Sequence, residues 1–222
     1  MAAIKPSDFD DRKAKEKMLE MMEFVNGRSG GSAQIMAVTK GFPKEAAVAA
    51  YQTGITLLGE NYAQELIKKH EALSGLEVEW HMIGSLQRNK VRKLSEIVSV
   101  WQTVDRVSLL SEIAKYHPSA KVLIQINPLQ IPNKAGCSIP EAEILLEQGA
   151  GMGLFIKGVM AVGMQGNLEE TSKIFREAVD FAERFELPER SIGMTEDLEV
   201  AIDYGSTLLR IGRALFGDRP NK

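Results

Sequence analysis

Eight short apolar runs, separated by amphipathic stretches, constrain the fold of this chain more than any other feature of its sequence. Such runs are typical of strands buried on both faces of a sheet. Strands that alternate strictly with helices form a parallel sheet, and eight repeats favour closure into a single (β/α)8 barrel of the TIM type. An open doubly wound sheet is the alternative. The predicted strands are Gln34 to Val38, Ile55 to Leu58, Glu79 to Ile83, Val98 to Thr103, Val122 to Asn127, Ile156 to Ala161, Ser191 to Gly193 and Leu208 to Ile211.

Residues that commonly begin or end helices support this alternation. Pro43 can open a helix that Gly54 closes, and Ser138 with Glu141 forms a capping-box pattern. An extra helix is expected before the first strand, from Ser7 to Phe24. The predicted N-caps of two further helices are Asp105 and Thr195.

The chain of 222 residues is predicted to form one domain, with a core from about residue 34 to 217. No proline-rich or glycine-serine linker divides it. The glycine cluster from Gly149 to Gly153 joins a predicted helix to the next strand. A dinucleotide-binding fingerprint requires the opposite order, so no nucleotide site is expected there.

Charge and composition narrow the partners and the compartment. The formal net charge of -3 gives no general attraction to nucleic acid or to anionic lipid. Neither an export signal near the N-terminus nor an apolar run of about 18 residues is visible. Cys137 is the only cysteine, which fits a reducing compartment. We therefore expect a cytoplasmic protein that binds neither nucleic acid nor membrane.

Lys40 is the first candidate for chemistry. It directly follows the first predicted strand in AVTKGFP, and functional groups of a barrel gather at the carboxyl ends of its strands. Desolvation at such a position disfavours the ammonium form, lowers the pKa and frees the amine to attack an aldehyde. Lys40 is therefore a candidate for Schiff-base chemistry, and the alternative is a solvated loop lysine without such a role.

An anion site is expected near the last two strands. Thr195 is placed to cap a helix whose free amides and dipole would face an anion, and Gly212 permits close approach of the backbone. Glu196 and Asp197 fall in the first turn of the same predicted helix. Their carboxylates would repel a phosphate unless they are directed away from it.

Six blocks of the sequence, in order, carry a family resemblance. They are AVTKGFP, LLGENYAQEL, EWHMIGSLQRNK, VLIQINPLQIPNKAG, IKGVMAVG and SIGMTEDLEVAIDYGSTLLRIGRALFG. Over the segment from Gln34 to Gly217 that they span, the chain resembles the pyridoxal phosphate homeostasis proteins.

The resemblance implies a barrel like the N-terminal domain of alanine racemase, which binds pyridoxal phosphate covalently and takes part in intracellular vitamin B6 and amino-acid balance. No enzymatic reaction is established for the family. The Schiff-base lysine would be Lys40, and Asn61 would lie beside the cofactor ring. Thr195, next to Met194, stands where the family usually has serine, and its hydroxyl can still donate to phosphate. Backbone amides around Gly212 and Arg213 would hold the phosphate.

Arg210 would face the pyridine nitrogen, as in the racemase-like fold. An arginine only donates hydrogen bonds, so the ring nitrogen should stay unprotonated and the ring should be a poor electron sink. Racemases also have a C-terminal domain that supplies a catalytic tyrosine, and only DRPNK follows Gly217 here. We therefore expect a carrier or regulator of the cofactor with no catalytic residues, and no metal site, since no ligand set has metal spacing.

Two alternatives share Lys40 with this interpretation. One is a pyridoxal phosphate-dependent racemase or decarboxylase of narrow specificity, which would need a second acid/base group near the ring. The other is an aldolase-like barrel that forms its Schiff base directly with a substrate. For the carrier, the expected partners are pyridoxal phosphate and the apo-enzymes that use it, and the expected state is a monomer or a weak homodimer.

Two further residues receive weaker predictions. His81 lies within a predicted strand and is expected to be a hydrogen-bonded interior histidine rather than a base. Lys134, in IPNKAG, matches a lysine of the family's KSG sequence. We hypothesise that it takes part in handing the cofactor on.

Overall fold

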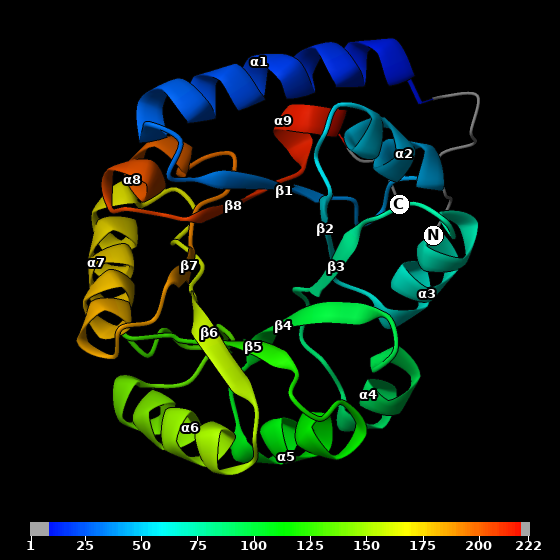
Figure 1. Ribbon diagram of the computed structural model, residues 1–222. Coiled ribbons are helices and arrows are strands. Elements are labelled where there is room, and N and C mark those ends of the chain that lie inside the picture. The colour runs from blue at the N-terminus through cyan, green and yellow to red at the C-terminus, as the bar shows by residue number, and fades with distance from the viewer. Residues whose placement is uncertain (1–8, 219–222) are drawn as a thin grey trace.

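A computed structural model describes residues 9–218 as a barrel of eight strands surrounded by helices (Figure 1). Neighbouring strands pair in parallel in the order β8-β1-β2-β3-β4-β5-β6-β7. Two backbone hydrogen bonds join the remaining edges, from Arg210 N to Gly193 O (3.0 Å) and from Thr207 N to Arg190 O (3.0 Å). The strands are β1 (Gln34–Val38), β2 (Leu57–Glu60), β3 (Glu79–Met82), β4 (Val98–Val104), β5 (Lys121–Gln125), β6 (Phe155–Met160), β7 (Glu189–Ser191) and β8 (Leu208–Ile211).

Helices follow the strands around the outside of the barrel, as the strand-helix alternation predicts. The predicted TIM-type fold is therefore confirmed, and the open doubly wound sheet is wrong. The helices are α1 (Asp11–Ser29), α2 (Lys44–Gln52), α3 (Ala63–Ala72), α4 (Arg88–Leu94), α5 (Val107–Tyr116), α6 (Ile139–Gly151), α7 (Leu168–Arg184), α8 (Leu198–Asp203) and α9 (Arg213–Phe216).

The extra N-terminal helix is present as α1, which contacts α2, α8 and α9. It begins after Asp10, whose carboxylate accepts from the amide of Lys13 (3.0 Å), and it ends at Gly30 in the left-handed conformation. It therefore runs five residues beyond the predicted end at Phe24. The predicted start at Ser7 lies outside the described residues.

Two strand predictions are displaced along the chain, while the other predicted ends differ by at most two residues. Ile55 is buried, but its amide donates to Ala50 O at the end of α2, so β2 starts only at Leu57. The seventh strand pairs earlier than predicted, because Glu189 lies opposite Gly158 of β6. Its first two residues are charged and gave no apolar signal. Gly193 has a φ of 94° and lies beyond the strand.

The helix-boundary predictions have mixed outcomes. Pro43 is the N-cap of α2, and Gly54, with a φ of 92°, follows its end. The capping box is present, since Ser138 N donates to Glu141 Oε2 (2.8 Å). The predicted N-caps Asp105 and Thr195 are wrong, because α5 begins after Arg106 and α8 begins after Asp197.

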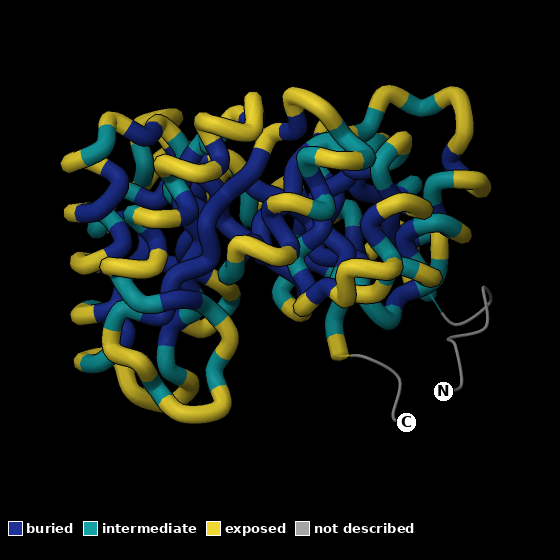
Figure 2. The backbone as a smooth tube through the Cα atoms, turned by 90° about the horizontal axis from the view of Figure 1, so that it is seen from below, coloured by how far each residue is buried: buried dark blue, intermediate teal, exposed yellow. Residues whose placement is uncertain are grey.

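Two apolar clusters fill the molecule. The larger lies between the strands and the helices and includes Trp80, Trp101 and Phe175, each at most 1% exposed. The smaller, made by Val100, Leu123 and Met160, fills part of the barrel interior. Figure 2 shows buried backbone through the centre and exposed segments around it. Within residues 9–218, no helix is both long and apolar enough to cross a membrane.

The close approach of β6 to β7 yields a stability prediction. A Cβ on Gly158 would lie 1.9 Å from Glu189 O, so Gly158→Ala should lower the free energy of unfolding by about 3 kcal/mol. Gly151→Ala is the matched control, because a Cβ there meets nothing within 4 Å at the end of α6. It should leave stability unchanged or raise it by up to about 1 kcal/mol. Equal urea midpoints for the two variants would contradict this packing.

Candidate functional site

A cavity of about 610 Å³ lies at the carboxyl end of the strands. That volume falls in the ordinary range for small-molecule sites. The loops after β1, β2, β6, β7 and β8 contribute to its wall. All of the residues predicted to bind the cofactor line it, namely Lys40, Asn61, Met194, Thr195, Arg210, Gly212 and Arg213.

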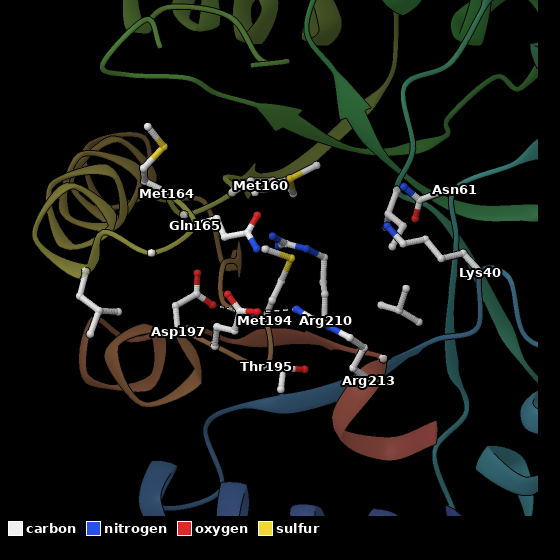
Figure 3. Close-up of a pocket in the computed structure, with 18 residues that line it drawn as sticks. Lys40, Asn61, Met160, Met164, Gln165, Met194, Thr195, Asp197, Arg210 and Arg213 are labelled. Carbon is white, nitrogen blue, oxygen red and sulfur yellow. Dashed lines mark hydrogen bonds and ion pairs between the residues drawn. The ribbon is translucent and has the colours of Figure 1, made fainter. Parts of the chain in front are cut away.

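Strand alternation directs Lys40 into the cavity. Successive side chains of a strand point to opposite faces, and here Val38 and Lys40 line the cavity while Thr39 bonds to Glu60 outside it. Figure 3 shows the Lys40 side chain extending toward Asn61, across the cavity from Thr195 and Asp197. Lys40 thus approaches the centre of the cavity from the β1 side.

Asn61 follows β2 directly and offers a hydrogen-bond acceptor beside Lys40. A Cβ on Gly84 would lie 2.1 Å from Asn61 O, so only glycine at position 84 allows the two loops to pack this closely. The Asn61 Oδ1 atom is buried and has no partner among the described residues. Buried polar atoms are normally hydrogen-bonded, so this oxygen is available to a donor on a ligand.

Arg210 stands in the centre of the cavity floor (Figure 3). It is 5% exposed, and its guanidinium donates to Ala161 O (2.8 Å), to Ser191 Oγ (2.9 Å) and to Ser191 O. Burial lowers the pKa of Arg210 to about 10, and the nearby Asp197 carboxylate opposes that change. Arg210 therefore remains a cation and a pure donor at neutral pH.

A chain of buried hydrogen bonds continues from Arg210 across the barrel interior. Ser191 Oγ donates to Gln102 Oε1 (2.7 Å), and Gln102 Nε2 lies 2.6 Å from His81 Nδ1. The amide of Gln102 thus makes Nδ1 the acceptor, which leaves the ring proton on Nε2. His81 is 3% exposed and does not line the cavity. The prediction of a hydrogen-bonded interior histidine is confirmed.

The turn from Met194 to Asp197 differs from the predicted helix N-terminus. Asp197 Oδ1 accepts from Met194 N (2.5 Å), which closes the turn and delays the helix to Leu198. Thr195 lies within that turn and caps no helix, so the predicted helix-capped anion site is wrong in this respect. Burial raises the pKa of Asp197, opposed by its hydrogen bond from Met194 and by Arg210.

The two carboxylates that would repel a phosphate are both engaged. Glu196 Oε1 pairs with the Arg213 guanidinium (2.5 Å), and Asp197 binds the Met194 amide. Gly212 brings the backbone close to β1, since a Cβ there would lie 3.1 Å from Val38 O. Thr195 and Arg213 lie at one side of the cavity (Figure 3), and Gly212, which precedes Arg213, also lines it.

The loop after β6 was missed by sequence reasoning, although it forms a large part of the wall. It contributes Val162 to Gly166, with Met160 at the strand end and Leu168 at the start of α7. A Cβ on Gly163 would lie 2.3 Å from Asp197 Oδ2, so this glycine allows the β6 and β7 loops to meet. The sequence feature that could have revealed this loop is the VGMQG segment, which comes shortly after a buried strand.

Lys134 lies behind this loop and does not line the cavity. Its Nζ donates to Gly163 O (2.9 Å). Burial lowers the pKa of Lys134, and the carboxylates of Asp197 and Glu170 oppose that shift. Lys134 is thus a partly desolvated amine whose hydrogen-bond partner, Gly163, lines the cavity.

Comparison with known proteins defines the class of this barrel. Residues 15–220 match the family model for the N-terminal domain of alanine racemase. The structure is similar to alanine racemase from Bacillus anthracis, with a TM-score of 0.75 and 17% identity, over 96% of this chain and 57% of that one. The fold is therefore that of the alanine racemase N-terminal barrel.

Relatives with higher sequence identity show to which family the chain belongs. The pyridoxal phosphate homeostasis protein of Haemophilus influenzae is 36% identical over 207 residues, 86% of this chain and 87% of the relative. PipY of Synechococcus elongatus PCC7942, solved with pyridoxal phosphate bound, has a TM-score of 0.82 and 29% identity, over 92% of this chain and 100% of that one. The chain belongs to the pyridoxal phosphate homeostasis protein family, which confirms the resemblance.

The buried histidine yields a prediction for stability against pH. Burial lowers the pKa of His81 from 6.5 to about 4, with a smaller contribution from Lys121. Because this folded-state pKa lies below the unfolded one, the contribution of His81 is present above pH 6.5 and is lost as the pH falls toward 4. The free energy of unfolding should therefore fall over this range by roughly 3 kcal/mol more in the unaltered protein than in His81→Gln. Urea titrations between those pH values measure it, and parallel curves would contradict it.

Proposed function

We propose that the protein binds pyridoxal phosphate in this cavity, as a Schiff base on Lys40, and serves the homeostasis of that cofactor. The observation that carries the proposal is the placement of Lys40 and Arg210 in one cavity, with a buried and unpartnered Asn61 Oδ1 beside the lysine. The family's name and the cofactor bound in PipY support it. When bound, the cofactor supplies an aldehyde that is reactive toward primary amines.

The residues around the cavity fit the parts of this cofactor. Lys40 supplies the amine, and Asn61 Oδ1 is placed to accept a hydrogen bond from a group next to the bond that Lys40 forms. Arg210 donates toward the ring nitrogen, since an arginine carries more N–H donors than its contacts to Ser191 and Ala161 use. Each of these side chains lines the cavity.

The phosphate belongs on the side formed by the last two strands. The Thr195 hydroxyl, the Arg213 guanidinium and the backbone at Gly212 are the donors there, and Met194, next to Thr195, also lines the cavity. The pairing of Arg213 with Glu196 balances the charge of this rim before any anion arrives.

Binding without catalysis is the role that we propose for this site. Arg210 keeps a ring nitrogen unprotonated, which weakens the ring as an electron sink. Among the described residues that line the cavity there is no His, Tyr or Cys, and both acidic ones are paired, Glu196 with Arg213 and Asp197 with the Met194 amide. A second acid/base group for racemisation is therefore not provided. The relatives are named for homeostasis and not for a reaction.

The wider role that we propose is cytoplasmic. The protein holds the reactive aldehyde in a covered site and releases it to apo-enzymes that depend on pyridoxal phosphate. We propose that it does so as a monomer or a weak homodimer.

The first test concerns Lys40. The purified protein should be yellow, and borohydride reduction should add the mass of one cofactor, which peptide mapping places on Lys40. Lys40→Ala should remove both the long-wavelength absorbance and the mass increase, because no other amine of the described residues lines the cavity. Lys44→Ala, an exposed lysine four residues on, is the control and should keep both.

Other outcomes of that experiment would overturn the proposal. A cofactor that remains attached in Lys40→Ala would place the site elsewhere. Steady racemisation or decarboxylation of amino acids by the unaltered protein would make it an enzyme instead.

The second test concerns Lys134. Because its partly desolvated amine sits directly behind the Gly163 loop of the wall, Lys134→Ala should slow transfer of the cofactor to an apo-enzyme by about tenfold, while Lys40 still binds it. The transfer is measured by the activation of an added apo-enzyme. Lys173→Ala, which replaces an exposed lysine, is the control. Unchanged uptake and transfer would exclude a role for Lys134.

A further inference from the structure

A cluster of charged side chains lies directly behind Lys40, outside the cavity. Its members are Lys69 and Glu65 of α3 and Glu60 at the end of β2, and we call them the Lys69 cluster. Lys69 Nζ lies 2.5 Å from Glu60 Oε1 and 3.6 Å from Glu65 Oε2. Glu60 is fully buried, and Lys69 is 5% exposed. None of the three lines the cavity.

The hydrogen bonds of the cluster converge on the residues before and after Lys40. Lys69 Nζ donates to Thr39 O (2.6 Å), and Thr39 Oγ1 donates to Glu60 Oε1 (2.6 Å). On the other side of Lys40, Gly41 N donates to Glu65 Oε2 (2.8 Å). The backbone on both sides of Lys40 is therefore held by charged side chains that are themselves held by one another.

Stability alone does not account for such an arrangement. Removing an ammonium and a carboxylate from water is costly, and apolar residues of similar volume often replace a buried ion pair without loss of stability. Burial accordingly raises the pKa of Glu60, although Lys69 and Thr39 oppose the shift. What charged partners provide and apolar ones do not is a fixed direction for the hydrogen bonds to Thr39 and Gly41.

We infer that Lys69, Glu60 and Glu65 are positioning residues for Lys40, which fix its backbone so that its amine meets the aldehyde of the cofactor at a constant place. This inference rests on the proposed function of Lys40. Lys69 itself does not contact the cofactor. The Lys69 cluster instead affects the rate at which Lys40 reacts, because small displacements of a reacting group reduce rates strongly.

The experiment compares three lysine variants of the full chain. Lys69→Met keeps the length and removes the donor, Lys69→Arg keeps a charged donor, and Lys68→Met alters the exposed neighbour on the same helix. The apo-proteins are mixed with pyridoxal phosphate, and the rate of Schiff-base formation is followed by absorbance. Borohydride reduction and peptide mapping locate the product, and circular dichroism with urea unfolding reports the fold.

We expect Lys69→Met to slow the reaction at Lys40 at least about tenfold in a folded protein. Lys69→Arg should recover part of that rate, and Lys68→Met should match the unaltered protein. A purely structural role would change the urea midpoint without this pattern of loss and rescue. A folded Lys69→Met that reacts within about twofold of the unaltered protein overturns the inference.

A second variant covers the case in which Lys69→Met does not fold. Glu65→Gln removes the negative charge of the side chain that accepts from Gly41 N. The Glu65 side chain is 28% exposed, so the protein should tolerate this substitution. It should also slow the reaction, and an unchanged rate overturns the inference. If the unaltered protein itself fails to bind the cofactor at Lys40, it is the proposed function that fails. If it binds there and the variants react equally fast, only the positioning role fails.

Discussion

The buried guanidinium of Arg210 is the interaction on which both the barrel and its cavity depend. The sheet has ladder pairing between every pair of neighbouring strands except β7 and β8. Arg210 lies at this junction, where its backbone amide binds Gly193 O and its side chain binds Ser191 O and Ala161 O. One residue of β8 therefore ties together the ends of β6, β7 and β8. The Arg210 side chain also lies in the cavity floor. The contacts that close the barrel therefore also place this guanidinium in the site.

The two walls of the cavity are supported in different ways. The Arg210 side is supported from within the barrel, by the hydrogen-bonded chain through Ser191 and Gln102 to His81. The Lys40 side is supported from outside the barrel, by the Lys69 cluster between β2 and α3. Both supports are buried and polar, and unpaired groups in such networks are costly. Among the described residues, His81 Nε2 on the Arg210 side and Glu60 Oε2 on the Lys40 side are buried without a hydrogen-bond partner, and so is Asn61 Oδ1 at the cavity wall.

These features are the ones on which the proposed carrier role rests. The cavity presents one amine, two arginines, two side-chain amides and a hydroxyl among apolar side chains, and its acidic groups are paired. Such a set can bind and orient an anionic aldehyde. A racemase requires two groups that exchange protons with a substrate on opposite faces, and the described lining residues include no His, Tyr or Cys.

The sequence by itself determined the eightfold alternation, the placement of Lys40 and Arg210 at strand ends, and the membership of the family. These follow from local periodicity and from motifs that are contiguous along the chain. It did not determine that Thr195 caps no helix. The Asp197 carboxylate binds the amide of Met194 and holds residues 194–197 in a turn, and this contact depends on the surrounding loops. Nor did the sequence reveal the β6 loop, the chain from Arg210 to His81, or the Lys69 cluster. Those contacts join residues far apart in sequence, such as Ser191 with Gln102 and Lys69 with Thr39. Only closure of the barrel decides which side chains meet, because the pleat sets the face of a residue and the pairing of strands sets its neighbour.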